Sequence, residues 1–185
     1  MSRDEIHLVP DRATVDLASL FRAHYGRLVR ALTLVCGDAD GAADAVQEAF
    51  VKAHLRWRKL QHYDDPVGWI RRVAINKLRD DNRRRIRKDR AVERLGAGAE
   101  STVAEHEPGH DGLLRTLLAD LPRQQRLTVA LYYVDGLSVA ETAATLELSE
   151  GAVKYHLHQA RERLRGRVEP DGSLRSPDEQ NQRDH

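Results

Sequence analysis

Apolar residues recur at steps of three and four along much of the chain, and this spacing places them on one face of a helix. One such stripe covers residues 17–35 and stops at Gly37. A second covers residues 46–57, and Asp40 before it is the expected N-cap of that helix. A third begins near Pro66, a residue that is tolerated in the first turn of a helix. These three helices, with short connections, predict one small bundle.

The helical spacing disappears over residues 89–111, where glycine, alanine, serine and acidic residues predominate. We interpret this segment as a flexible linker. Apolar stripes resume at residues 113–121 and 127–134, on either side of Pro122. After residue 168 the sequence has no apolar face, and we expect a disordered tail there. Because no strand pattern occurs, the sequence predicts an all-α fold, with two small helical bundles joined by a flexible linker.

The second bundle contains the pattern of a helix-turn-helix. Ser138 and Glu141 have the spacing of a capping box, and Ser149 can cap a longer final helix after a turn at residues 147–149. The apolar residues of that final helix must face the core, which leaves its polar side chains free to enter a major groove. These side chains are Lys154, Tyr155, His156, His158, Gln159 and Arg161. An ordinary helical hairpin is the alternative interpretation.

The distribution of charge along the chain is a second indication that the protein binds a polyanion. The totals nearly cancel, with 30 Lys and Arg against 29 Asp and Glu and a formal net charge of +1. Basic residues nevertheless concentrate between Arg71 and Arg90 and again on the last helix, whereas the linker and its flanks are acidic. Two cationic faces on two helical units are typical of a protein that binds a polyanion at two places. For either face taken alone, a merely solvated basic helix is the alternative.

Other features exclude several classes of protein. The single cysteine, Cys36, rules out an internal disulfide framework and a Cys-based zinc cluster. No apolar run approaches the roughly 20 residues of a membrane span, and residues 1–12 do not resemble a secretory signal, so we expect a cytoplasmic protein. The string from His106 to His110 matches the H-E-x-x-H zinc motif, but Pro108 and Gly109 oppose the helix that this motif needs. We interpret it as a chance match and expect no metal, no cofactor and no catalytic residue.

Together, the two units resemble the extracytoplasmic-function (ECF) sigma factors, the group-four RNA polymerase sigma subunits that are reduced to sigma regions two and four. Region two is similar to LFRAHYGRLVRALTLVCGDADGAADAVQEAFVKAHLRW followed by PVGWIRRVAINKLRDDNRRR, and region four to LPRQQRLTVALYYVDGLSVAETAATLELSEGAVKYHLHQARERLR. The resemblance implies a promoter-specific initiation factor rather than an enzyme. The division that it implies is an N-terminal tail at 1–14, region two at 15–88, the linker at 89–111, region four at 112–168 and a C-terminal tail at 169–185.

The resemblance also implies partners. In the family, the polar face of the second helix docks on the clamp-helix coiled coil of the largest subunit of core RNA polymerase, and region four meets the flap of the second-largest subunit. The polar residues at the matching positions are Asp44, Gln47, Glu48 and Lys52. Without the resemblance, a solvated face would be the default interpretation. An anti-sigma protein is a further partner of many relatives, but nothing in the sequence identifies one.

By the same comparison, the third helix recognises and opens the minus-ten element of promoter DNA. An unpaired base needs a flat partner or a pocket, and its backbone needs cations. The residues carried over are Trp69, Arg72, Asn76, Arg79, Asp80, Arg83 and Arg84, with His62, Tyr63 and Asp64 as the rim for the flipped base. Trp69 is in helical phase with Val73, so a position in the core is an equal alternative.

Region four is expected to read the minus-thirty-five element as duplex DNA, through Ser149 and the exposed polar side chains of the last helix. Many relatives have glycine where Glu147 stands, so a left-handed backbone at this turn would cost roughly 1 kcal/mol, or the turn must differ. Relatives often carry arginine or serine where this chain has Tyr155, His156 and Gln159, and we therefore expect a different promoter preference. A stand-alone helix-turn-helix regulator is the alternative function.

Overall fold

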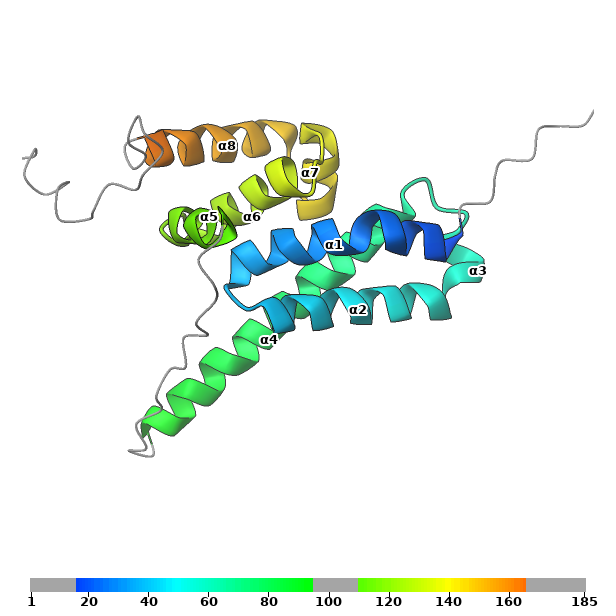
Figure 1. The fold of residues 1–185 in the computed structure, drawn as a ribbon, viewed down its shortest axis with the longest axis horizontal. Coiled ribbons are helices and arrows are strands. Elements are labelled where there is room, and N and C mark those ends of the chain that lie inside the picture. The colour runs from blue at the N-terminus through cyan, green and yellow to red at the C-terminus, as the bar shows by residue number, and fades with distance from the viewer. Residues whose placement is uncertain (1–15, 95–109, 166–185) are drawn as a thin grey trace, which may run out of the picture.

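The computed structural model describes residues 16–94 and 110–165. All regular elements in these residues are helical, which confirms the predicted all-α class (Figure 1). In chain order they are α1 (Leu17–Cys36), α2 (Ala39–Leu55), α3 (Trp57–Leu60), α4 (Pro66–Arg94), α5 (His110–Ala119), α6 (Arg123–Val129), the π-helical turn η1 (Ala130–Val134), α7 (Val139–Leu146) and α8 (Glu150–Arg165).

The ends of α1 and α2 follow the capping residues of the sequence, with one correction. Gly37 ends α1 in the left-handed conformation, with φ 74°, as a C-cap glycine does. The N-cap of α2 is Asp38, whose side chain accepts a hydrogen bond from the backbone N–H of Gly41 at 2.9 Å. The prediction of Asp40 as N-cap is wrong, because Asp40 lies in the first turn of the helix. There its charge still complements the positive end of the helix dipole.

Helix α4 is longer than the sequence predicts. It continues to Arg94, so residues 89–94, placed in the linker, are helical. Helix α5 likewise begins at His110, within the end of the predicted linker. The C-terminal part of α4 projects away from the other helices (Figure 1). Residues 83–88 of this part are exposed, and a helix without a buried face has no apolar stripe that would show in the sequence how far it extends.

Two of the exclusions drawn from the sequence can be compared with the described residues. Residues 95–109, which include most of the string from His106 to His110, lie outside them. Among residues 16–94 and 110–165, no group of three His, Cys, Asp or Glu side chains is placed to hold a metal ion. In the same ranges, no helix combines the length and the apolar character that crossing a membrane requires.

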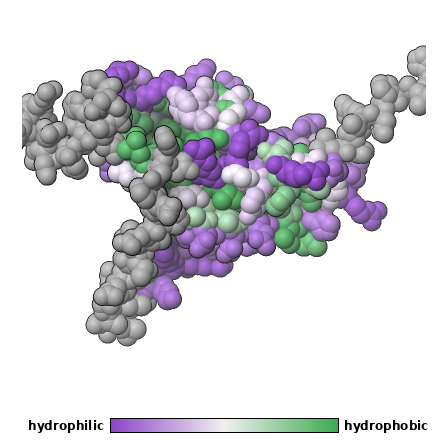
Figure 2. Space-filling view, viewed as in Figure 1, coloured by the Kyte–Doolittle hydropathy of each residue, from purple (hydrophilic) through white to green (hydrophobic). Residues whose placement is uncertain are grey.

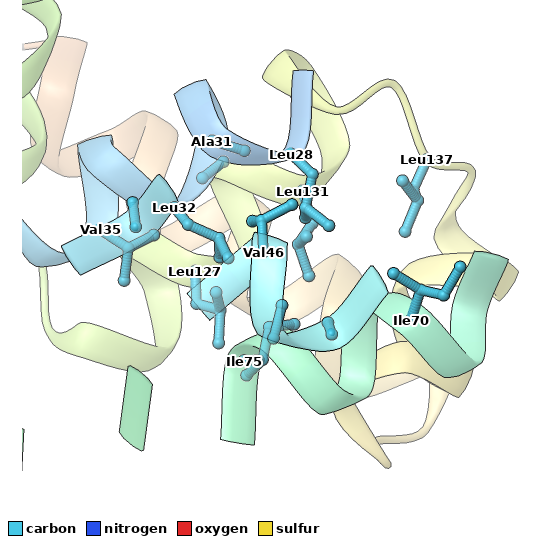
Figure 3. Packing of buried hydrophobic residues seen from close by; sticks show 14 of the residues in the cluster. Leu28, Ala31, Leu32, Val35, Val46, Ile70, Ile75, Leu127, Leu131 and Leu137 are labelled. Carbon is cyan, nitrogen blue, oxygen red and sulfur yellow. The ribbon is translucent and has the colours of Figure 1, made fainter. Parts of the chain in front are cut away.

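One hydrophobic core contains residues of both predicted bundles (Figure 3). Leu32 of α1, Val46 of α2 and Ile75 of α4 belong to the same buried cluster as Leu127 of α6 and Leu131 of η1. A second cluster joins α5, α6, α7 and α8, and it also receives a leucine from α1. Helix α1 thus lies between α2 and α4, the first group of helices, and α5 to α8, the second group (Figure 1). The two bundles are closed on each other through a shared core.

A buried ion pair also connects the two bundles. The Nε atom of Arg71 in α4 donates to Oδ2 of Asp135, which follows η1, at 2.6 Å. Arg71 is 7% exposed and Asp135 only 2%, so both charges have lost nearly all their water. Removing a charge from water is costly unless a partner compensates it. Arg71 therefore does not belong to the exposed basic face on which the sequence pattern placed it.

A second arginine ties the bundles through backbone groups. Arg126 of α6 donates from one terminal nitrogen to the carbonyl of Val35 in α1 at 3.0 Å. Its other terminal nitrogen donates to the carbonyls of Ala119 and Leu121 at 2.7 and 3.1 Å. One guanidinium thus satisfies carbonyl groups near the ends of two helices, where backbone acceptors lack intrahelical partners.

Candidate DNA and polymerase interfaces

The polar residues predicted to meet the polymerase lie together on the exposed side of α2. Asp44, Gln47 and Lys52 are exposed and Glu48 is half-buried. Glu48 bonds Lys52 within α2 at 2.7 Å and Lys77 of α4 at 3.0 Å. These hydrogen bonds hold the pKa of Glu48 below its ordinary value. The result is a shallow, mixed-charge depression between α2 and α4.

Helix α4 contributes residues to this depression that sequence reasoning missed. Lys77 also pairs with Asp81 at 3.3 Å, and Glu48 and Asp81 together raise the pKa of Lys77. Both residues border the depression beside Asp44 and Gln47. Only the packing of α4 against α2 brings them there, and a helical pattern read one helix at a time has no signal for that contact.

A second depression lies where α2, α3 and the start of α4 meet. It is lined by Leu55, Arg56, Arg58, Lys59, Leu60, Tyr63 and Trp69. The ring of Tyr63 is 41% exposed, and the guanidinium carbon of Arg56 lies 5.9 Å from the centroid of the Trp69 ring. Leu55 is the most exposed large hydrophobic residue described, at 78%, and Figure 2 shows an apolar area near this end of α2. The depression therefore combines apolar surface, two aromatic rings and several cations.

Trp69 is neither fully in the core nor fully exposed. Its side chain is partly buried against the shared core, and it also forms part of this depression. Asp65 fixes the start of α4 by accepting from the backbone N–H of Gly68 at 2.7 Å. His62 and Asp64 are exposed in the same loop but do not line the depression. Tyr63 is the member of the predicted rim that does.

The remaining residues of the minus-ten set form one stripe along α4. Arg72, Asn76, Arg79 and Arg83 follow one another at steps of three or four positions, which is the spacing of neighbours on a helix surface, and Asp80 and Arg84 are adjacent to the last two of them. Asn76, Asp80, Arg83 and Arg84 are exposed, whereas Arg72 and Arg79 are half-buried. Their mutual contacts are loose: Arg79 bonds Asn76 at 3.3 Å, and Arg83 lies 4.0 Å from Asp80. Loosely paired arginines on an exposed face remain available to phosphate groups.

The helix-turn-helix forms with the predicted caps. Ser138 accepts from the backbone N–H of Glu141 at 3.2 Å, and the Glu141 carboxylate accepts from the backbone N–H of Ser138 at 2.8 Å. The pKa of Glu141 is lowered by these bonds to Ser138. Ser149 caps α8 by accepting from the backbone N–H of Ala152 at 3.1 Å. The turn at residues 147–149 and the longer helix after it are thus confirmed.

The polar residues of α8 differ in how accessible they are. Lys154, Tyr155, His158 and Arg161 are exposed, whereas His156 and Gln159 are half-buried. The predicted apolar residues of this helix face inward, with Val153, Leu157 and Ala160 buried and Leu164 half-buried. Figure 2 shows mainly hydrophilic side chains along α8.

Tyr133 of η1 is a residue of this surface that sequence reasoning missed. The Nε atom of Arg161 donates to its hydroxyl at 2.8 Å, and the guanidinium carbon lies 5.9 Å from the ring centroid. Tyr133 itself is 54% exposed. The contact positions Arg161 at the edge of the α8 face. It links residues 28 positions apart, so only the tertiary structure reveals it.

Glu147 adopts the left-handed conformation that the sequence comparison questioned, with φ 58° and ψ 43°. It is the only non-glycine residue with positive φ among those described, and its side chain is exposed. Glu147→Gly is therefore expected to raise the free energy of unfolding by about 0.5–1 kcal/mol, because glycine has no Cβ to strain here. Urea unfolding measures the change. Ala144→Gly, inside α7, is the matched control and should lower stability by about 1 kcal/mol; equal losses in both variants would contradict the assignment.

Comparison with known proteins shows the family of the chain. The family models "Sigma-70 region 2" and "Sigma-70, region 4" match residues 20–89 and 111–164. The chain is 33% identical over 161 residues to the ECF RNA polymerase sigma factor SigM of Mycobacterium tuberculosis, a match that covers 85% of this chain and 79% of SigM. It is 32% identical over 149 residues to the RNA polymerase sigma-E factor of Streptomyces avermitilis, which covers 80% and 82%. The chain belongs to the ECF family of RNA polymerase sigma factors.

Solved structures share the fold. The sigma factor RpoE of Bartonella quintana, solved with the anti-sigma factor NepR, superposes with a TM-score of 0.68 at 21% identity, over 82% of this chain and 95% of RpoE. CnrH, solved with the cytosolic domain of CnrY, gives a TM-score of 0.55 at 25% identity, over 81% and 85%.

Proposed function

We propose that this sigma factor binds core RNA polymerase through α2, opens the minus-ten element with α4 and its neighbouring depression, and reads the minus-thirty-five element with α8. The observation that carries the proposal is the continuity of the α4 stripe with the aromatic depression at Tyr63 and Trp69. A cationic track beside an aromatic pocket suits one displaced DNA strand with an unstacked base. The sigma-factor names of the relatives support the same activity.

At the minus-ten element, melting follows from unequal affinity for closed and open DNA. Unstacking and unpairing a base costs a few kcal/mol, and stacking it on an aromatic side chain returns about 1–3 kcal/mol per base. Tyr63 offers an exposed ring for that contact, and Trp69 lines the same depression. Arg83 and Arg84, exposed along α4, would hold the phosphates of the same strand. No bond is made or broken, and the chain acts entirely through binding.

At the minus-thirty-five element, α8 would lie in the major groove of the duplex. Its exposed Lys154, His158 and Arg161 suit phosphates and guanine edges, and Tyr155, at 59% exposure, offers a flat apolar surface. Gln159 is half-buried, so it reaches a base edge only where the helix sits deep in the groove. Ser149 contributes its hydroxyl to the cap of α8 and is left with its own proton as a donor to a phosphate.

Reading both elements requires the closed bundles to separate. The two element names place them about 25 base pairs apart, which corresponds to roughly 85 Å of duplex. The longest helix, α4, has 29 residues and is therefore about 44 Å long. Faces that share one core cannot contact both elements at that distance. The closed arrangement is accordingly the state of the free protein, and the polymerase would hold the open one.

Another protein could control the equilibrium between the closed and open arrangements of the two bundles. RpoE was solved in complex with the anti-sigma factor NepR, and CnrH was solved in complex with the cytosolic domain of CnrY. An anti-sigma protein would act on this chain by binding surfaces that the polymerase or the promoter needs. The flap of the second-largest polymerase subunit is the partner proposed for the second group of helices, α5 to α8.

Run-off transcription with bacterial core polymerase and a genomic promoter library tests the activity, and sequencing of the products identifies the promoter. No product together with no core association would overturn the proposal.

Tyr63→Ala tests the depression. Open-complex formation, followed by the fluorescence of an unpaired 2-aminopurine, should fall about 5- to 100-fold, since one stacking contact is lost. Tyr63→Phe keeps the ring and is the matched control, with near-normal opening. Equal losses in the two variants would show that the ring does not stack on a base.

A further inference from the structure

A cavity lies at the seam between the first group of helices and the second. It has a volume of about 210 Å³ and is partly enclosed. Leu32 and Val35 of α1 and Ile75 of α4 line it from one side, and Leu127 of α6 lines it from the other. All four side chains are buried members of the shared core, so the deep wall of the cavity is apolar.

The mouth of this cavity is strongly cationic. Arg85 of α4 and Arg123 and Arg126 of α6 line it. Among the described residues, no carboxylate forms an ion pair with any of these three side chains. Arg85 bonds only the side-chain oxygen of Asn82 at 3.2 Å, Arg126 bonds backbone carbonyls, and its buried Nε has no partner among the described atoms. Burial, followed by the charges of Arg79 and Arg83, lowers the pKa of Arg123.

We propose that the cavity binds a small organic anion that carries a short apolar chain, such as a medium-chain carboxylate. The apolar wall would take the chain and the arginines the anionic head, because guanidinium groups match carboxylates in geometry as well as in charge. A phosphate head would use the same arginines, so the shared chemistry is an amphiphilic anion. The volume suits a molecule about the size of octanoate, since ligand sites enclose most of what they bind.

Such a ligand would also bias the arrangement of the two bundles. The walls come from α1 and α4 on one side and from α6 on the other, so the cavity exists only when the bundles are closed. A ligand that binds one state of an equilibrium shifts the population towards that state. The anion would therefore hold the sigma factor closed. The binding site itself does not depend on the promoter contacts proposed above, and its test uses no DNA.

Calorimetric titration of the full chain tests the site, with octanoate as the probe and octanol and inorganic phosphate as matched controls. Octanoate is expected to bind with 1:1 stoichiometry in the millimolar range or tighter, and each control at least about fivefold more weakly. Arg123→Gln and Arg85→Gln should each weaken octanoate binding at least about fivefold. Arg87→Gln, on the exposed surface of α4 and outside the lining, should leave it unchanged. Octanol binding as tightly as octanoate, or unaltered affinity in both cavity variants, would overturn the assignment.

Cys36 gives a second readout that locates the ligand. Its thiol lines the cavity and is the only cysteine of the chain. Burial raises the pKa of this thiol, which lowers its thiolate fraction, and its alkylation by N-ethylmaleimide can be followed in time. Octanoate should slow this alkylation, and the protection should be lost in Arg123→Gln. Unchanged alkylation at saturating octanoate would show that any binding occurs elsewhere and would contradict the proposal.

Discussion

Asp135→Ala is expected to open the closed arrangement of the two bundles. The substitution leaves Arg71 buried at 7% exposure with no carboxylate to compensate its charge, a loss of about 3–5 kcal/mol. Because the ion pair joins α4 to the residue after η1, its loss acts on the contact between the bundles. The closed fraction should fall by more than about a hundredfold relative to the open one. Small-angle X-ray scattering of the free protein should show a larger radius of gyration.

A double variant separates the effect of the unpaired charge from that of the packing. Replacing both partners by apolar residues of similar size, Arg71→Met with Asp135→Leu, removes the buried charges together. Such replacements are often neutral or stabilising, so the radius of gyration should return to that of the original chain. If Asp135→Ala left both the radius of gyration and the urea midpoint unchanged, the ion pair would contribute nothing to closure.

Glu48→Lys is expected to abolish binding to core polymerase. In the structure, Glu48 lies between Lys52 and Lys77, bonded to them at 2.7 and 3.0 Å. A lysine at this position would place three cations together and reverse the charge at the centre of the α2 surface. A reversed charge at the centre of the proposed interface breaks its electrostatic complementarity, and we expect a cost of several kcal/mol, which corresponds to at least about a hundredfold loss of affinity. Fluorescence anisotropy with labelled chain and core polymerase measures that loss.

The control for Glu48 keeps the shape and removes only the charge. Glu48→Gln retains a hydrogen-bond acceptor for both lysines and should lose less affinity than Glu48→Lys. Binding to duplex DNA is the second control, and it should stay unchanged in both variants because the surface proposed for that contact lies on α8, away from Glu48. A Glu48→Lys chain that still supports full transcription would favour a polymerase contact elsewhere. Promoter-specific control without any polymerase contact would favour the stand-alone regulator.

Local signals in the sequence predicted those parts of the fold that depend on local contacts. The capping box of Ser138 and Glu141, the C-cap at Gly37 and the cap of α8 at Ser149 each rest on atoms within four residues. Asp38 and Asp40 show the limit of this reasoning. Both are good N-cap residues two positions apart. Which of them caps α2 depends on how soon the next helix starts after Gly37, the left-handed residue that ends α1.

The features that sequence reasoning missed depend on contacts between distant residues. Arg71 stands in a run of basic residues and has the pattern of a surface position. In the structure it is buried, because it forms an ion pair with Asp135, 64 residues away in the sequence. The contacts of Lys77 with Glu48 and of Arg161 with Tyr133 also cross between helices. Periodicity describes one helix at a time, so it placed the predicted DNA and polymerase residues on faces but could not say what those faces touch.

The shared core has a thermodynamic consequence for assembly with the polymerase. When the bundles separate, apolar side chains such as Leu127 and Leu131 lose partners on α1, α2 and α4. Exposure of apolar surface to water raises the heat capacity, whereas burial in a new interface lowers it. The two contributions oppose each other during assembly. If the bundles separate on binding as proposed, the heat-capacity change of polymerase binding would be less negative than the area of the final interface alone implies.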